Sequence, residues 1–101
     1  MLGEIVLHRQ WIYPEWSGFP LIPSRSAMQE LWKYYMNLED VKTVLEKGFD
    51  CAAGRRRKGT IEKCIRKGKK LVKVVVVKSY NYSLKTDCWL VTHVGALAPR
   101  E

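Results

Sequence analysis

Two side chains in the second half of the sequence could act on a phosphodiester. His93 could move a proton near neutral pH, where an imidazole titrates, and Lys73 could place a positive charge beside a phosphate. RNA cleavage without a metal needs a base for the 2′-hydroxyl, a cation for the phosphate and an acid for the leaving oxygen. We therefore predict His93 and Lys73 as catalytic residues. The alternative is a histidine bonded to neighbouring backbone and a lysine whose stem covers apolar surface.

Positive charge is concentrated between Gly54 and Lys73. This stretch holds ten Lys and Arg residues against one acid, a charge of +9, whereas the whole chain carries +8. Such clustering favours a polyanionic partner, most often nucleic acid and next an acidic protein or membrane surface, although a solvated hairpin needs no ligand. We predict RNA as the partner. The nucleic-acid-binding candidates are Arg55, Arg56, Arg57, Lys58, Lys63, Arg66, Lys69 and Lys70.

The sequence holds no signal for a metal, a cofactor or a membrane. Cys51, Cys64 and Cys88 are an odd number of widely spaced cysteines without a Cys-x-x-Cys pair, so small buried thiols are expected rather than a disulfide or a zinc site. No phosphate loop, metalloprotease motif or serine elbow occurs. With no secretory signal and no long apolar run, a reduced cytoplasmic protein is predicted.

The sequence predicts two helices followed by strands as the framework for these side chains. Ser24 or Ser26 can cap a helix over residues 24–36, and Asn37 a second one ending near Lys47, where Gly48 is expected to provide a left-handed exit. The first helix shows an apolar stripe at i, i+3, i+4 and i+7, made of Met28, Leu31, Trp32 and Tyr35.

Short strands are predicted over residues 49–53, 60–66, 71–77 and 88–94. Five valines in the seven residues 71–77 indicate a central strand covered on both faces. Short connections make neighbouring strands antiparallel, with residues 79–87 as a polar loop. The prediction is one α+β domain, residues 1–101, with two N-terminal helices (24–48) packed on one face of a four-stranded antiparallel sheet (49–95) and a tail at 96–101.

Residues 1–23 form an aromatic-rich arm. Pro14, Gly18, Pro20 and Pro23 exclude a long helix after Tyr13. The arm either packs across its own sheet or offers a surface to a partner. One such partner is a second copy of the chain, in a homodimer. The aromatic residues in question are Trp11, Tyr13, Trp16 and Phe19.

Three stretches carry a resemblance to a known family. LEDVxxVLEKG at 38–48, KLVKVVVV at 70–77 and WLVTH at 89–93 are similar to small bacterial and archaeal proteins catalogued as domain of unknown function 4258. The resemblance covers residues 24–95 and implies a relationship to RelE-like and barnase-like ribonucleases, many of them toxins of toxin–antitoxin pairs. The family's first helix has a His-Ala pair and two arginines, where this chain has Ser26-Ala27, Glu30 and Tyr34, so those charges are missing.

Three functions are left open at this point. A RelE-like RNA-cleaving enzyme predicts that His93, Lys73 and an arginine share one concave patch. A non-catalytic module for RNA or an acidic partner predicts a continuous basic strip. A toxin-type protein held by an acidic antitoxin-like partner predicts an exposed apolar groove near Trp11, Trp16 and Trp32.

Overall fold

A six-stranded curled sheet forms the centre of the protein. The computed structural model describes residues 13–51 and 58–97. The strands lie in the order β1-β2-β6-β5-β4-β3, and every neighbouring pair is antiparallel except β2 and β6, which are parallel. Their bounds are β1 Glu15–Trp16, β2 Phe19–Pro23, β3 Phe49–Asp50, β4 Thr60–Lys67, β5 Lys70–Asn81 and β6 Thr86–Leu97.

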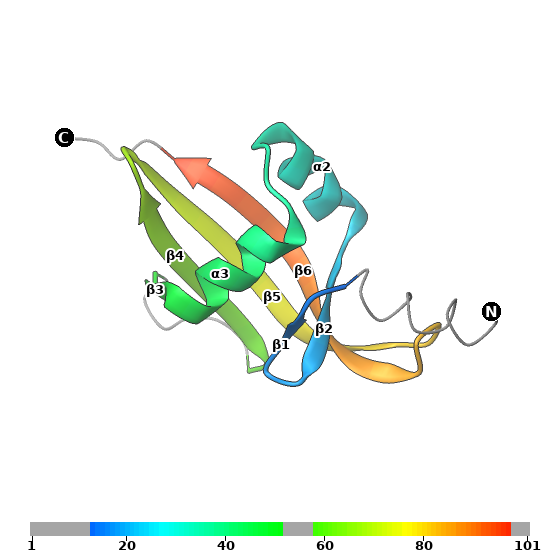
Figure 1. Ribbon diagram of the computed structural model, residues 1–101. Helices are drawn as coiled ribbons and strands as arrows, with labels where there is room; N and C mark the ends of the chain where they lie inside the picture. Colours follow the sequence, from blue (N-terminus) through cyan, green and yellow to red (C-terminus); the bar gives the residue numbers. More distant parts are fainter. Residues whose placement is uncertain (1–12, 52–57, 98–101) are drawn as a thin grey trace, which may run out of the picture.

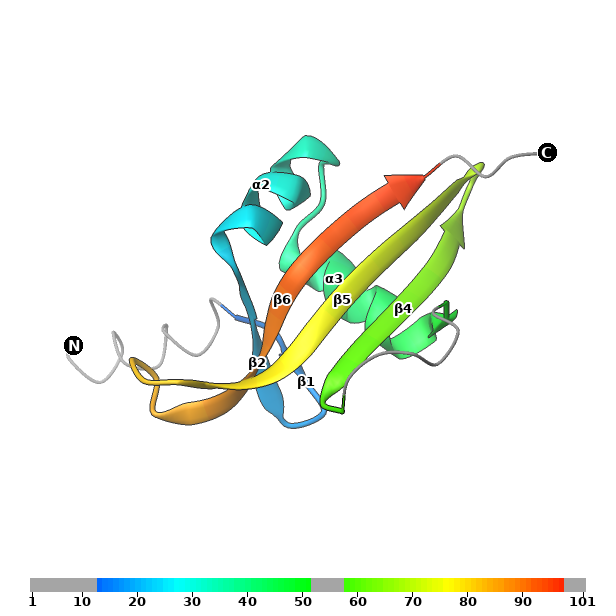
Figure 2. The same cartoon turned by 180° about the vertical axis from the view of Figure 1, so that it is seen from behind.

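Two helices cover one face of this sheet (Figure 1). They are α2, Arg25–Lys33, and α3, Leu38–Lys47, and both lie between β2 and β3 in the chain. We call the face that they cover the helix face. No helix among the described residues lies over the opposite face, which we call the open face (Figure 2).

The predicted fold class is wrong in the number and the direction of the strands. Two strands precede the helices, and β2 joins the sheet parallel to β6, with Leu21 opposite Trp89 and Pro23 opposite Val91. Proline lacks the N–H of a central strand, which is why this segment looks irregular in the sequence. The pairing of β2 with β6 spans only three residues. On its other side β2 pairs with β1, and the N–H of Leu21 extends that ladder by bonding to the carbonyl of Pro14, at 2.9 Å.

The hydrophobic core lies between the helices and the helix face. Val74 and Val76 of β5 are fully buried there, and β5 runs between β4 and β6, so the predicted central valine strand is confirmed. On the open face Val75 is 5% exposed but Leu71 and Lys73 are half-buried, so the predicted cover on both faces is present only at Val75. The other buried members of the core are Leu21, Ala27, Leu31, Val41, Val44, Leu45, Val72, Trp89, Val91 and Val94.

The apolar stripe predicted for the first helix is largely wrong. Helix α2 buries Ala27 and Leu31, whereas Trp32 is 72% exposed and Tyr35 is 97% exposed. Tyr35 also lies beyond the last residue of the helix and has a left-handed φ of 57°, so helical spacing does not extend to it. The helix is therefore rotated by about one position from the prediction, and its aromatic side faces outward.

The predicted caps are confirmed, but Gly48 has a different reason to be glycine. The Ser24 hydroxyl accepts from the N–H of Ala27 at 3.1 Å, and Asn37 and Asp40 form a capping box with two bonds of 2.9 Å. Gly48 is extended, with φ −79° and ψ 176°, and is not left-handed. A Cβ there would lie 2.5 Å from the carbonyl oxygens of Cys64 and Val44, so only glycine fits between α3 and β4.

The last two strands are longer than predicted. Strand β5 continues to Asn81 and β6 begins at Thr86, so most of the expected polar loop is a hairpin, and β6 runs past Gly95 to Leu97. The ladder shifts register between Val75 and Val76, which pair with His93 and Val91. Thr92 is therefore the extra residue of a β-bulge, and the bulge decides which way His93 points.

The expected set of three buried thiols is wrong. A disulfide joins Cys51, just after β3, to Cys64 in β4, and Cys88 is the one free cysteine. The register brings the two cysteines together, because Phe49 lies opposite Cys64, and Cys51, two residues further along, points to the same face, with its Cα 5.5 Å from that of Cys64. The spacing of 13 residues carries no motif, so the bond depends on tertiary structure. Burial, and secondarily the charge of Asp87, raise the pKa of the Cys88 thiol.

We expect one reactive thiol per chain after unfolding without reductant. Denatured, unreduced protein should react with a thiol reagent at Cys88 alone, and reduction should raise the count to three. The folded protein should react slowly, because Cys88 is buried and its pKa is raised. Mass spectrometry of the alkylated protein measures both counts. Three thiols without reductant, in protein purified under oxidising conditions, would contradict the disulfide.

Candidate nucleic-acid interface

The alternation of side chains along the strands divides the candidate residues between the two faces of the sheet. Lys63 and Lys67 share the helix face with Ile61 and Ile65, which pack on the core. The open face carries Glu62 and Arg66 of β4, Lys73 of β5 and His93 of β6. The predicted catalytic and nucleic-acid-binding residues therefore do not form one continuous surface.

His93 and Lys73 lie on neighbouring strands of the open face. Lys73 is paired with Gly95, and the His93 ring lies over that glycine, since a Cβ at Gly95 would meet His93 Nε2 at 3.3 Å. His93 Nδ1 lies 3.1 Å from Glu30 Oε2 of helix α2, and the other oxygen of that carboxylate accepts from the N–H of Val94 at 2.7 Å. Glu30 thus orients the imidazole and satisfies an outer N–H of β6.

Each of these two candidates already faces a carboxylate. Lys73 Nζ lies 3.6 Å from Glu62 Oε2, and the Glu62 side chain is only 6% exposed. The same oxygen lies 3.4 Å from the Sγ atom of Cys51 in the disulfide. A phosphate approaching His93 and Lys73 would therefore meet the negative charges of Glu30 and Glu62 as well, which opposes binding of an anion.

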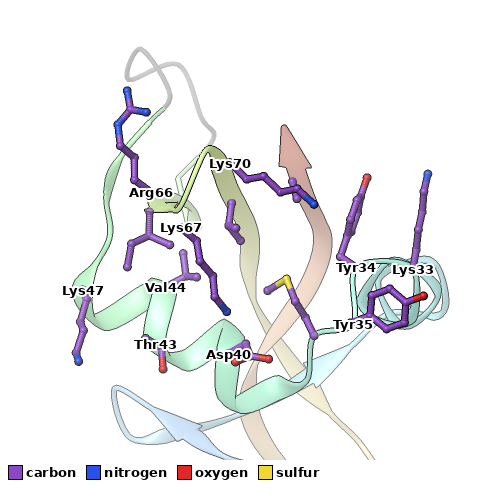
Figure 3. Close-up of a pocket in the computed structure, with 14 residues that line it drawn as sticks. Lys33, Tyr34, Tyr35, Asp40, Thr43, Val44, Lys47, Arg66, Lys67 and Lys70 are labelled. Carbon is purple, nitrogen blue, oxygen red and sulfur yellow. The ribbon is translucent and has the colours of Figure 1, made fainter. Parts of the chain in front are cut away.

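A hollow lies on the helix face, between the β4–β5 hairpin and the corner where α2 meets α3 (Figure 3). Its volume is about 630 Å³. Among the described residues, five cationic residues and one acidic residue, Asp40, line it, and the floor is apolar. The cations are Lys33, Lys47, Arg66, Lys67 and Lys70, and the apolar residues are Met36, Val44, Ile65, Val72 and Ala96. We call this hollow the basic cleft.

Two of the lysines reach into the basic cleft. Lys67 and Lys70, which are paired at the end of the hairpin, extend from it toward the helix corner, whereas Arg66 and Lys47 point outward (Figure 3). Gly68, with φ 64°, makes the tight turn that brings the two lysines side by side. Asp40 carries one negative charge against the two positive charges of these lysines, and its carboxylate also accepts the N–H of Asn37 at 2.9 Å.

An aromatic ring forms the wall opposite these lysines. Tyr34 ends helix α2 and packs partly on the core. It stands between Lys33 and the cleft (Figure 3), and Lys33 Nζ lies 5.5 Å from its ring centroid, which is within cation–π range. The Tyr35 ring is directed away from Lys67 and Lys70.

The predicted nucleic-acid-binding residues have separate positions. Arg66 and Lys70 border the cleft, Lys69 lies in the hairpin turn, and Lys63 forms an ion pair of 2.8 Å with Asp50. Lys58 is exposed at the start of the turn before β4, and Arg55, Arg56 and Arg57 lie outside the described residues.

The sequence did not predict four of the residues that line the basic cleft, Lys33, Tyr34, Lys47 and Lys67. The sequence did carry a signal for Lys67, because it lies at an even spacing from Ile61 and Ile65 along one strand and therefore points to the same face of the sheet. For the helix residues no local signal exists, since only the packing of α2 and α3 against the sheet brings them to the cleft.

The groove expected near the tryptophans is only partly present. Trp16 packs on Trp89 with ring centroids 5.0 Å apart and belongs to the domain's own interior, and Trp11 lies outside the described residues. Trp32 borders a shallow hollow with Pro14, Met28 and Leu38. The described part of the arm therefore packs on its own sheet.

The described residues provide neither a metal site nor a membrane-spanning helix. Among residues 13–51 and 58–97 no group of three or more His, Cys, Asp or Glu side chains is placed to hold a metal ion. Over the same residues, neither helix has the length and apolar character that crossing a bilayer requires.

No family model, curated protein or solved structure matches the chain. The resemblance to the family of domain of unknown function 4258, and to RelE-like ribonucleases, stays a prediction from the residues that carry it.

Proposed function

We propose that this protein binds RNA without cleaving it and that the basic cleft is the binding site. The observation that supports this most is that Lys67 and Lys70 reach into an open hollow lined, among the described residues, by one carboxylate, that of Asp40, between elements far apart in the chain. Lysine and arginine side chains that meet phosphates release condensed counterions, and this release drives salt-dependent binding. The net charge of +8 adds long-range attraction for a polyanion.

RNA cleavage is the second candidate, and one contact favours it. The Glu30 carboxylate, 3.1 Å from His93 Nδ1, orients the imidazole as a carboxylate does in many general-base sites, and Lys73 shares its face of the sheet. We place it second because Glu30 and Glu62 counter the positive charge there and the basic cleft opens on the opposite face.

With RNA as the partner, the compartment that we propose is the cytoplasm. Thiols are kept reduced there, so we expect Cys51 and Cys64 to be free thiols in the cell and to be joined after oxidation. The basic cleft does not contain either cysteine, and RNA binding should therefore be the same in reduced and oxidised protein.

Neutralising the two cleft lysines should weaken RNA binding about tenfold or more. In a Lys67→Gln/Lys70→Gln variant two phosphate contacts are lost, so the slope of log affinity against log salt should fall by about 1 to 2. Fluorescence anisotropy with a labelled oligoribonucleotide over a salt series measures both quantities. The RNA recovered from these samples should be intact.

The matched control is Lys42→Gln/Lys85→Gln, which removes the same charge away from the cleft. It should lower affinity by less than about threefold. An equal loss in the two double variants would mean that only net charge matters and would contradict the site. Cleavage of the RNA that disappears in His93→Ala would establish the second candidate instead.

A further inference from the structure

We infer that the basic cleft takes a single-stranded segment of RNA, with one unpaired base stacked on Tyr34 and the adjoining phosphates on Lys67 and Lys70. This inference rests on the proposed function and narrows its ligand. A cluster of lysines alone would accept any polyanion. The chemistry of the opposite wall and of the floor selects a ligand that is anionic on one side and flat and apolar on the other.

The Tyr34 ring is held in a position suited to stacking. Its outer side faces the Lys33 ammonium, 5.5 Å from the ring centroid, and its other side faces the cleft (Figure 3). Because the ring also packs on the core, little side-chain freedom is lost when a base stacks on it.

The floor of the cleft suits a base and is unsuited to a bare phosphate. Met36, Val44, Ile65, Val72 and Ala96 supply apolar surface there. A phosphate pressed on such surface would lose hydration without gaining a hydrogen bond, whereas a base buries its flat face favourably. The volume of about 630 Å³ lies within the range typical of sites for small ligands.

The spacing of the elements places phosphates and base in different parts of the site. Lys67 and Lys70 come from the hairpin, and Tyr34 comes from the helix corner on the far side. A strand of RNA crossing the cleft could keep its backbone along the hairpin and turn a base toward the corner (Figure 3). In a duplex the bases are already stacked and paired, so only the backbone would be available to the lysines.

The test separates the aromatic contact from the charges. The probe is a short labelled oligouridylate, compared with the same strand annealed to its complement, with inorganic polyphosphate and with poly-glutamate. In Tyr34→Leu, which keeps apolar bulk but no flat ring, affinity for the single strand should fall about fivefold or more. Polyphosphate binding should be unchanged, and Tyr34→Phe should bind the single strand as the wild type does.

Tyr82→Asn is the matched control, because it removes a tyrosine that is 83% exposed and does not line the cleft. This variant should bind every probe as the wild type does. Circular dichroism and the melting temperature check that Tyr34→Leu is folded, and Tyr34→Met replaces it if it is not.

The outcomes separate this inference from the proposed function. Equal affinity for single strand, duplex and polyphosphate, or an unchanged single-strand affinity in Tyr34→Leu, would overturn the inference while leaving a Lys67- and Lys70-dependent polyanion site. Preference for poly-glutamate over every nucleic acid would replace RNA by an acidic protein. No binding of any polyanion at low salt would overturn both.

Discussion

Replacing Leu21 with alanine is expected to lower the free energy of unfolding by about 2–5 kcal/mol. Leu21 is fully buried, and it lies in β2 opposite Trp89 of β6, in the parallel pair that the sequence did not predict. Removing its branched side chain loses the apolar transfer energy and leaves a cavity, because the strands and helices around it cannot collapse fully. Urea unfolding followed by tryptophan fluorescence and circular dichroism measures the change.

Ile22→Ala is the control for this variant. Ile22 follows Leu21 in β2, so it points to the open face, and it is only half-buried. Its loss should cost about 1 kcal/mol. Small and equal effects of the two substitutions would mean that residues 19–23 are not part of the sheet.

Replacing Gly48 with alanine is expected to cost about 3 kcal/mol, at the upper end of what overpacking usually costs. The added methyl would lie 2.5 Å from two carbonyl oxygens, one in β4 and one in α3. Backbone atoms cannot turn aside as a flexible side chain does, so the helix and the strand must separate. Because α3 also supplies one wall of the basic cleft, RNA affinity should fall together with stability. Unfolding in urea and anisotropy on the same sample test both.

Gly68→Ala separates this steric effect from the general cost of losing a glycine. Gly68 has a left-handed φ of 64°, but no atom lies within 4 Å of the position that a Cβ would take. Alanine there should cost about 1 kcal/mol, from backbone conformation alone. If Gly48→Ala is no more harmful than Gly68→Ala, the close approach of α3 to β4 is not as the structure has it.

The two faces of the sheet suggest a division of roles. On the open face Lys73 pairs with Glu62 across β5 and β4, and His93 of β6 contacts Glu30 of α2. These contacts hold the strands and helix α2 together. The helix face carries Lys67 and Lys70, and among the described residues that line the cleft one carboxylate, that of Asp40, faces their charges. Cations left without full compensation are the ones available to a ligand.

Local signals in the sequence determined the two helices, their caps and the central valine strand. Ser24 and Asn37 act on N–H groups within three residues, and the preference of successive valines for a pleated strand needs no distant partner. The concentration of charge between Gly54 and Lys73 was equally visible. These features depend on neighbours along the chain, which a single sequence displays.

Tertiary structure decided the rest. The pairing of β2 with β6 joins Leu21 to Trp89 across most of the chain, and two prolines hide the strand locally. The bulge at Thr92 turns His93 toward Glu30, and the approach of α2 to the hairpin sets Tyr34 opposite Lys70. The physical reason is common to all three. Which face a side chain occupies, and what it meets there, depends on the packing of segments that are distant in sequence, and composition and local periodicity do not carry that information.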